Sequence, residues 1–183
     1  MSRASPSLFE RSVALGLLAG SVPVLVAASV AIVAFGGGNP LFAQSRVGLD
    51  RQTFTVLKLR TMSQGVVTPV GRALRRTKVD ELPQLLNIVR GEMRFVGPRP
   101  ITQYDVRRLG WHSVEHDPRW AVAPGITGPT QLSTICDADL AARRDRRFAA
   151  EAGVTDEIEL LILSLARPIV GAQRIASRVE RWT

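Results

Sequence analysis

The chain has 183 residues, a net charge of +8 and a single cysteine, Cys136. This length suits one domain with a small appendage, and one cysteine excludes an internal disulfide framework and favours a reducing compartment. Only Lys58 and Lys78 are lysines, so nearly all the positive charge is arginine. Arginine suits phosphate-bearing partners, although a composition bias explains the excess equally well.

The first element is an apolar segment, because residues 13–35 carry no charged side chain. It is too long for the core of a signal peptide, and as a helix of about 35 Å it could cross a hydrocarbon core of roughly 30 Å. Pro23 near its middle removes a backbone hydrogen bond, and Ser21 could satisfy a carbonyl freed there. Basic residues on both flanks favour a cytoplasmic position for both ends. These features support a kinked spanning helix and a re-entrant helix–break–helix equally.

After this segment the pattern predicts short elements, which together indicate an α-rich α+β fold. We expect residues 1–40 to form a membrane element, spanning or re-entrant, and residues 41–183 a membrane-associated cytosolic domain. In chain order the predicted elements are a β-hairpin at 41–48 and 53–60, a basic helix at 69–78, a helix at 81–93 with Gly91 as its stop, a strand at 95–101 broken by a Pro-Arg-Pro turn, a loop at 123–133, and helices at 139–153 and 156–179, the last bending at Pro168.

Two adjacent carboxylates, Asp80 and Glu81, precede Pro83, which favours the first turn of a helix. Asp80 could simply cap that helix, and from the pair alone this interpretation is favoured. A helix N-terminus also binds phosphate, and carboxylates placed there could bind Mg²⁺ and attack phosphorus. Nearby cations, including Arg75 and the proline-flanked Arg99, strengthen this second interpretation because they could neutralise a diphosphate. The same basic cluster also suits anionic membrane lipid.

Two further patterns suggest other functions. His112, Glu115 and His116 match the H-x-x-E-H signature of zinc hydrolases, but a nearby glycine and proline leave little room for the required helix. Residues 143–148, "RRDRRF", could bind nucleic acid, yet few aromatic residues are available for stacking and no nucleic-acid motif occurs. A solvated or membrane-skimming helix face is therefore favoured for this run, and no nucleic-acid partner is expected.

One ordered series of stretches resembles a known family. After the proline-broken apolar segment come "NPLFAQSRVG", "FTVLKLRTM", "RTKVDELPQLLNIVRGEMRFVGPRP" and "PGITGPTQLS". This series strongly resembles the monotopic phosphoglycosyl transferases, which are bacterial sugar transferases, in their minimal form. The resemblance runs from about Leu8 to Ser133 and is most specific between Arg72 and Pro100.

The resemblance implies a re-entrant membrane helix and transfer of a sugar 1-phosphate from a UDP-sugar to a polyprenol phosphate, usually undecaprenyl phosphate. Asp80 would attack the sugar-linked phosphorus in a ping-pong mechanism, forming an aspartyl-phosphosugar and releasing UMP. Glu81, with Asp80, would hold Mg²⁺. The enzyme would work at the cytoplasmic face of the bacterial inner membrane and start an exopolysaccharide, capsule, O-antigen or glycoprotein glycan for downstream glycosyltransferases. A homo-oligomer is left open.

The resemblance also assigns binding residues. Four basic residues match positions that contact nucleotide or phosphate: Lys58, Arg60, Arg75 and Arg99. Pro23 matches the helix-breaking proline, and Ser21 is adjacent to Val22, where many members have serine.

One departure affects the predicted activity. After Ser133 the family usually continues with Gly-Arg, and here Thr134 and Ile135 follow. This loss could mean an altered donor, replacement by Arg143 or Arg144, or weak activity. A membrane-anchored zinc hydrolase and a non-catalytic membrane-anchored protein that keeps the fold are the alternative functions.

Overall fold

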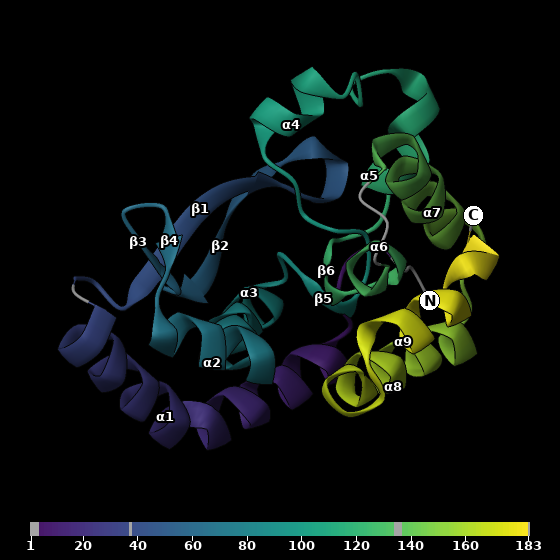
Figure 1. The fold of residues 1–183 in the computed structure, drawn as a ribbon. Helices are drawn as coiled ribbons and strands as arrows, with labels where there is room; N and C mark the ends of the chain where they lie inside the picture. The colour runs from purple at the N-terminus through teal and green to yellow at the C-terminus, as the bar shows by residue number, and fades with distance from the viewer. Residues whose placement is uncertain (1–3, 37, 134–136, 183) are drawn as a thin grey trace. The chain divides into compact units, whose positions relative to one another are not determined.

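The computed structural model describes residues 4–36, 38–133 and 137–182, so Thr134, Ile135 and Cys136 lie outside the described residues. The chain groups into two compact units (Figure 1). We call Ser7–Gln44 with Thr55–Gly91 the dyad unit, because it contains Asp80 and Glu81. We call Met1–Pro6, Ser45–Phe54 and Glu92–Thr183 the C-terminal unit. Helices predominate and the sheets are small and two-stranded, which confirms the predicted α-rich α+β fold.

The dyad unit begins with the long apolar helix α1 (Leu8–Gly36), whose axis bends along its length in Figure 1. A capping box starts it: the Ser7 N–H donates to the Glu10 carboxylate at 2.9 Å, and the Glu10 N–H donates to the Ser7 hydroxyl at 3.1 Å. Pro23 lies inside the helix without ending it. The segment Leu8–Phe35 is long and apolar enough to cross a membrane, and its re-entrant path stays a prediction.

Two polar contacts and a small apolar cluster hold α1. The Ser21 hydroxyl donates to the carbonyl of Leu18 at 2.8 Å, whereas the carbonyl that Pro23 frees is that of Ala19, so the expected role of Ser21 stays a prediction. Arg11 Nε donates to the carbonyl of Val89 at 2.8 Å, which joins the start of α1 to a distant part of the same unit. The buried side chains packed between α1 and the rest of the unit are Ala28, Ile32 and Leu59.

The remaining elements of the first half agree largely with the sequence. The predicted β-hairpin is present as strands β1 (Leu41–Val47) and β2 (Thr53–Leu59), which form one sheet, and η1 (Leu49–Arg51) lies in the turn between them. A second small sheet pairs β3 (Met62–Ser63) with β4 (Val66–Val67). The helices that follow are α2 (Pro69–Thr77), the 3-10 helix η2 (Val79–Gln84) and α3 (Leu85–Arg90).

Gly91 ends α3 in the left-handed region, with φ of 88°, which confirms the predicted stop. One detail of this segment was predicted wrongly. Asp80, Glu81 and Pro83 lie in the separate 3-10 helix η2, and not in the first turn of an α-helix.

The C-terminal unit is built around the parallel pair β5 (Arg94–Val96) and β6 (Gly125–Thr127). The sequence predicted only a loop where β6 and α6 (Pro129–Leu132) occur, because their apolar runs are too short to show a period. The other elements of the unit are α4 (Gln103–Arg108), η3 (Val114–His116), α5 (Asp117–Trp120), α7 (Ala138–Glu151), α8 (Val154–Val170), α9 (Ala172–Arg178) and η4 (Glu180–Trp182).

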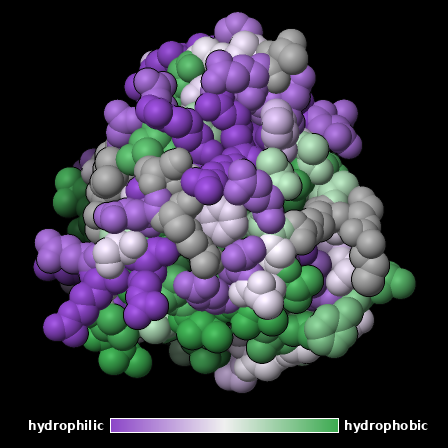
Figure 2. All heavy atoms as spheres, turned by 90° about the vertical axis from the view of Figure 1, so that its right-hand side faces the viewer, coloured by the Kyte–Doolittle hydropathy of each residue, from purple (hydrophilic) through white to green (hydrophobic). Residues whose placement is uncertain are grey.

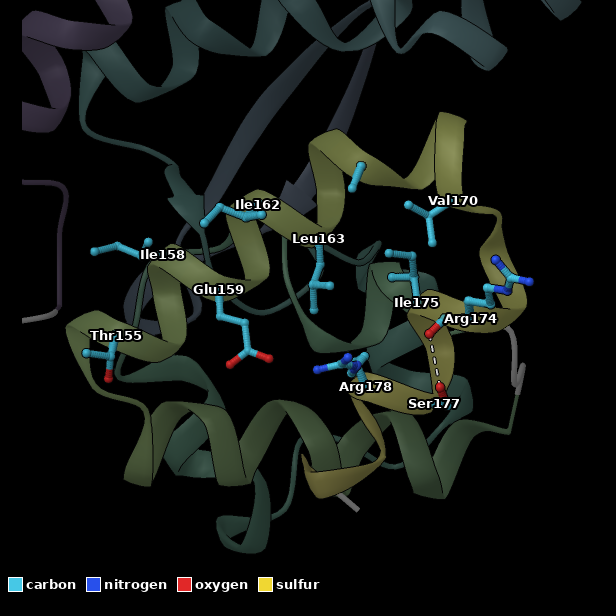
Figure 3. A pocket seen from close by; sticks show the side chains of 11 residues that line it. Thr155, Ile158, Glu159, Ile162, Leu163, Val170, Arg174, Ile175, Ser177 and Arg178 are labelled. Carbon is cyan, nitrogen blue, oxygen red and sulfur yellow. Dashed lines mark hydrogen bonds between the residues drawn. The ribbon is translucent and has the colours of Figure 1, made fainter.

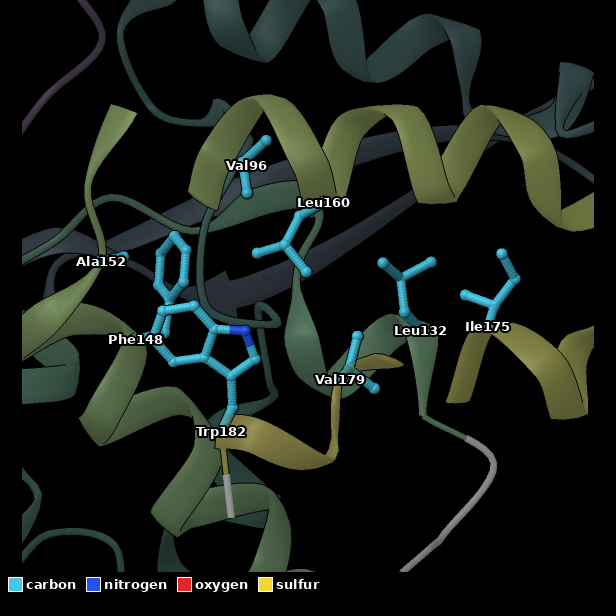
Figure 4. Packing of buried hydrophobic residues seen from close by; sticks show 8 residues of the cluster. All are labelled: Val96, Leu132, Phe148, Ala152, Leu160, Ile175, Val179 and Trp182. Atoms are coloured by element: carbon cyan, nitrogen blue, oxygen red, sulfur yellow. The ribbon is translucent and has the colours of Figure 1, made fainter. Parts of the chain in front are cut away.

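A buried cluster from β5, α6 and the last helices forms one core of this unit (Figure 4). Phe148 and Trp182 meet edge to face within it, with ring centroids 5.6 Å apart. The cluster consists of Val96, Leu132, Phe148, Ala152, Leu160, Ile175, Val179 and Trp182. A second cluster consists of Val47, Ile101, Val106, Trp111, Trp120 and Ala142.

Helix α8 runs through Pro168 to Val170 and Gly171 separates it from α9, so the chain breaks three residues after the proline, and the bend at Pro168 stays a prediction. A proline this close to a helix end removes few hydrogen bonds, whereas Gly171 adopts φ of 93°, which glycine accepts most readily.

Several aliphatic side chains of α8 are exposed, among them Leu165 and Ile169. A groove of about 710 Å³ lies along α8 and α9 (Figure 3). On the face drawn in Figure 2, hydrophobic and hydrophilic residues gather separately.

Candidate active site

A left-handed residue places the two carboxylates. Lys78 ends α2 and precedes η2 with φ of 63°, an uncommon backbone conformation for a residue with a side chain. This turn lets the 3-10 helix begin directly after α2, so that Asp80 and Glu81 occupy its first turn. Of the two, Asp80 is buried, with 7% of its surface exposed.

Asp80 does not act as a helix cap. The residue at the cap position is Lys78, and no side-chain hydrogen bond caps η2. Asp80 Oδ1 is buried and has no hydrogen-bond partner among the residues that the structure describes. Burial raises the pKa of Asp80, the charge of Glu81 raises it further, and Lys58 and Lys78 oppose this rise. Capping therefore does not explain this carboxylate, and its unsatisfied oxygen is available to a substrate or a cation.

Glu81 is held by two lysines. Lys58 Nζ lies 3.1 Å from Oε1 of Glu81, and Lys78 Nζ lies 3.6 Å from Oε2. The three side chains are partly exposed, at 31% for Lys58, 40% for Lys78 and 21% for Glu81. Lys58, which the family resemblance predicts as a substrate contact, thus lies beside Glu81, and its role toward substrate stays a prediction. The arrangement provides a fixed carboxylate between two cations, next to Asp80, whose Oδ1 has no hydrogen-bond partner within the described residues.

Asn87 is a positioning residue that the sequence analysis missed. It is fully buried on α3, and its Nδ2 donates to the carbonyl of Thr55 at 2.7 Å while its Oδ1 accepts from the N–H of Leu57 at 3.2 Å. The amide thus continues the hydrogen-bonding edge of β2 and fixes the strand that carries Lys58. The available signal was a lone amide within the apolar run "LLNIV", because a buried polar side chain needs partners.

The other predicted basic residues of this unit have different roles. Arg75 Nε donates to the Thr61 hydroxyl at 2.9 Å, and α2 lies close to this segment because Gly71 has no Cβ, which would sit 2.0 Å from the Thr61 carbonyl oxygen. Arg60 Nε is buried without a hydrogen-bond partner within the described residues. Arg75 and Arg60 therefore flank Thr61 in the same unit as the dyad.

Arg99 belongs to the C-terminal unit and its side chain is exposed. The predicted site residues are thus divided: Lys58, Arg60 and Arg75 share a unit with Asp80 and Glu81, and Arg99 lies in the other.

The donor set at the dyad suits Mg²⁺. Mg²⁺ prefers oxygen ligands and is usually bound by one or two carboxylates together with substrate phosphates. Asp80 Oδ1 is an unpartnered buried oxygen, and the neighbouring Glu81 supplies a second carboxylate. The residues present therefore fit the ion that the sequence predicts.

The zinc alternative finds no support in the geometry. The stretch with His112, Glu115 and His116 contains a single 3-10 turn, η3, and not the helix that the signature needs. The Glu115 carboxylate pairs with Arg146, and the His116 ring packs 5.7 Å from that of Trp111. Within residues 4–36, 38–133 and 137–182, no three His, Cys, Asp or Glu side chains gather where they could hold a metal ion.

The run at residues 143–148, predicted as a solvated or membrane-skimming helix face, is exposed only in part, at Arg143 and Arg147. Arg144 and Asp145 are buried, with 2% and 0% of their surfaces exposed, because this side of α7 packs inside the unit. Arg144 donates to the Ser133 hydroxyl, and burial lowers its pKa. Arg144 is therefore a structural contact at the point where the Gly-Arg pair is missing, and of the two suggested replacements only Arg143 is exposed.

Comparison with known proteins gives consistent matches. The family model of bacterial sugar transferases matches residues 1–169. A UDP-glucose:undecaprenyl-phosphate glucose-1-phosphate transferase of Caulobacter vibrioides is 40% identical over 124 residues, which cover 60% of this chain and 46% of that protein. An undecaprenyl-phosphate glucose phosphotransferase of Komagataeibacter xylinus is 32% identical over 186 residues, which cover 88% of this chain and 35% of that protein.

Other relatives carry names with different sugars. A UDP-galactose-lipid carrier transferase of Erwinia amylovora is 32% identical over 161 residues, which cover 72% of this chain and 33% of that protein. This chain thus spans less than half the length of each of these three relatives.

Proposed function

Because the chain belongs to the bacterial sugar transferases, we propose that it moves a sugar 1-phosphate from a UDP-sugar to undecaprenyl phosphate. The names of its relatives support this substrate class, since they include transferases that act on undecaprenyl phosphate. The observation that carries the proposal is the buried, unpartnered oxygen of Asp80 beside a lysine-bound Glu81. The relatives named for glucose and galactose do not select one sugar.

In the first step, an oxygen of the Asp80 carboxylate attacks the phosphorus that bears the sugar. A new bond forms between this oxygen and phosphorus, the bond to the bridging oxygen of the diphosphate breaks, and UMP leaves with the bridging oxygen. The carboxylate must be ionised to attack. The lysines beside Glu81 favour the ionised form of Asp80 against the effect of burial.

In the second step, a phosphate oxygen of undecaprenyl phosphate attacks the same phosphorus. The bond between Asp80 and phosphorus breaks, the carboxylate is restored, and the lipid-linked diphosphosugar leaves. Each substrate thus reacts in turn with the same side chain, which is a ping-pong scheme. An unpartnered oxygen suits this role because no protein hydrogen bond has to break before the attack.

The cations of the dyad unit would stabilise the substrate phosphates. Lys58 and Lys78 lie against Glu81, and Arg75 is fixed by its bond to Thr61, so their charges are already oriented when substrate arrives. Asp80 and Glu81 would hold Mg²⁺, which would neutralise charge on the transferred phosphate. Arg60 and Arg99 are further predicted phosphate contacts.

We place the enzyme at the cytoplasmic face of the bacterial inner membrane, with α1 re-entrant in the bilayer. The apolar length of α1 supports a membrane position, and the basic residues on both of its flanks support a cytoplasmic location for both ends. Labelling of cysteines introduced at residues 5 and 39 tests this topology. Labelling from opposite sides of the membrane would contradict a re-entrant path.

The test of the reaction uses the full chain in nanodiscs with Mg²⁺ and a panel of UDP-sugars. Incubation with donor alone should release about one UMP per enzyme and leave a phosphosugar on the protein, and adding undecaprenyl phosphate should start steady turnover. Asp80→Asn should abolish both events. The control is Asp139→Asn, since Asp139 is exposed on α7. Steady turnover by Asp80→Asn would remove Asp80 from this role, and no release from any donor would favour the non-catalytic alternative.

A further inference from the structure

The backbone around Arg99 is held at four successive carbonyl groups by four donors, which come from β6, from α5 and from two adjacent residues of β1. Pro98 is fully buried and Arg99 beside it is exposed, so the held backbone directs one cationic side chain outward. The contacts are Gly125 N–H to the Pro98 carbonyl at 3.0 Å, Arg119 Nη2 to the Arg99 carbonyl, Arg46 Nη1 to the Pro100 carbonyl at 3.2 Å, and Val47 N–H to the Ile101 carbonyl at 2.8 Å.

The donor to Arg99, Arg119, is itself held by a buried carboxylate. Its Nε donates to Oδ2 of Asp145 at 3.1 Å, and the two side chains are 2% and 0% exposed. The second oxygen of Asp145 accepts from the Thr130 hydroxyl at 2.6 Å. Both oxygens of Asp145 are therefore satisfied, and the guanidinium spans the gap between α7 and the turn that carries Arg99.

Two tryptophans flank the same guanidinium. It lies 5.0 Å from the ring centroid of Trp111 and 4.6 Å from that of Trp120, distances at which a cation is attracted to the ring face. Burial raises the pKa of Asp145, and the Arg119 charge opposes that rise. With its edges hydrogen-bonded and rings beside it, the orientation of Arg119 is strongly restricted, and so is that of the carbonyl it holds.

Stability alone does not explain an arginine at this position. Replacing a buried ion pair by apolar side chains of similar size is often neutral or stabilising. What an apolar side chain could not supply is the donation to the Arg99 carbonyl. The neighbourhood of Arg99 is also cationic. Burial lowers the pKa of Arg46, and the nearby charge of Arg99 lowers it further. A rigid turn that presents one arginine near another is suited to binding an anion.

We propose that the Arg119–Asp145 pair is a positioning device that aims Arg99 at a phosphate group of the donor substrate. Arg119 acts through the backbone of Arg99 and does not itself touch substrate. The inference rests on the proposed function, in which Arg99 binds phosphate. It assigns a role in donor binding to Asp145, which the sequence placed only in the run "RRDRRF", and to Arg119, which the sequence did not single out.

The test is a double-mutant cycle on the full chain in nanodiscs. Arg119→Lys keeps the charge but loses the planar fork that reaches both Asp145 and the Arg99 carbonyl. We expect Arg99→Ala to lower kcat/KM for the UDP-sugar by about 100-fold, as loss of a charged contact to substrate commonly does, and Arg119→Lys to lower it by about 10-fold, mainly through KM. In the Arg99→Ala background, Arg119→Lys should have no further effect on kcat/KM.

Arg94→Lys provides the matched control. Arg94 donates to both oxygens of Glu157 at 3.0 Å and is also buried, so Arg94→Lys likewise removes the planar fork of a buried arginine from a carboxylate. It should lower the thermal unfolding midpoint about as much as Arg119→Lys and leave KM for the donor unchanged. Comparing the two variants separates a loss of stability from a loss of the orientation of Arg99.

The outcomes are distinct. If Arg119→Lys lowers kcat/KM by the same factor with and without Arg99, the pair is only structural and the inference is overturned. If Arg99→Ala has no effect while the wild type turns over, the inference fails but the reaction class stands; absence of wild-type turnover with every donor counts against the proposed function itself. Should Arg119→Lys not fold, Thr130→Val, which removes the hydroxyl bonded to Asp145, is expected to raise KM by about 3-fold, again only when Arg99 is present.

Discussion

The two units each bury an aspartate, and the two aspartates differ in how they are partnered. Asp145 of the C-terminal unit is fully buried, and both of its oxygens are hydrogen-bonded, to Arg119 and to Thr130. Asp80 of the dyad unit is 7% exposed and has one oxygen with no partner among the described residues. Burial raises the pKa of both carboxyls. The pKa direction therefore does not separate a structural carboxylate from a reactive one, whereas the hydrogen-bond partners do.

The largest expected effect is on turnover by Asp80→Asn. Loss of the proposed nucleophile should lower kcat by at least about 1,000-fold. The unfolding midpoint should not fall, because Oδ1 of Asp80 has no hydrogen bond to any described residue that the amide would lose. Circular dichroism melts and UMP release on the same preparation check both statements. A clear loss of stability would mean that Asp80 has a structural partner and would end the contrast with Asp145.

Asp145→Asn should act mainly on stability. Removing the carboxylate charge leaves the buried Arg119 cation without its counter-charge, and such a change costs about 3–5 kcal/mol. Denaturant unfolding in detergent measures the difference. Glu151→Gln is the control on the same helix, since its pair with Arg147 is exposed and should contribute little. Equal midpoints for the two variants would show that the buried pair is worth no more than a surface one.

Gly71→Ala should disturb the dyad unit through packing. Alanine in place of a helical glycine usually stabilises, but here the added Cβ would lie 2.0 Å from the carbonyl oxygen of Thr61. We expect destabilisation of about 1–3 kcal/mol together with reduced activity, because Arg75 is bonded to Thr61. The control is Gly20→Ala on α1, where a Cβ meets nothing within 4 Å. Thermal melts of both variants compare the sites, and a stabilised Gly71→Ala would contradict the close approach.

The smallest expected effect is a pH dependence that follows Asp80. Its raised pKa means that, between the unfolded and the folded pKa, the folded protein binds more protons than the unfolded chain. Wild-type stability should therefore fall as the pH rises through this window, and Asp80→Asn should lack that loss. The midpoint difference between variant and wild type should grow with pH, and the acid limb of kcat/KM should lie above the ordinary aspartate pKa of about 3.9. An acid limb at or below that value would contradict the effect of burial.

The sequence predicted the elements of the dyad unit well because their signals are local. These signals are a basic helix, an apolar helix after it, and Gly91 as the stop between the apolar helix and the next strand. Each of them depends on residues close together in the chain. The family resemblance singled out Asp80 and Glu81, and the structure agrees that the two are adjacent to Lys58. Local patterns could not show that Oδ1 of Asp80 has no hydrogen-bond partner among the described residues. That property depends on where every other segment of the fold places its hydrogen-bond donors.

The errors concentrate where distant residues decide the outcome. The run "RRDRRF" looks solvated in sequence, yet Arg144 and Asp145 are buried because their partners, Ser133, Arg119 and Thr130, come from other elements. Similarly, Asn87 is one polar residue in an apolar helix, and its function becomes visible only when β2 lies against it. Buried polar networks of this kind carry no periodic signal, so hydrophobic patterning alone does not reveal them.

The unpartnered oxygen of Asp80 also has a consequence for laboratory evolution. A display screen that scores only resistance to proteolysis rewards folded chains and ignores turnover. In such a screen an amide at position 80 removes a charge that burial disfavours and an oxygen, Oδ1, that has no hydrogen-bond partner among the described residues, so chains without the proposed nucleophile would be enriched over the parent. The same screen would retain Asp145, because its loss leaves the buried Arg119 cation without its counter-charge. Engineering this chain for stability therefore requires a selection that also measures the proposed turnover.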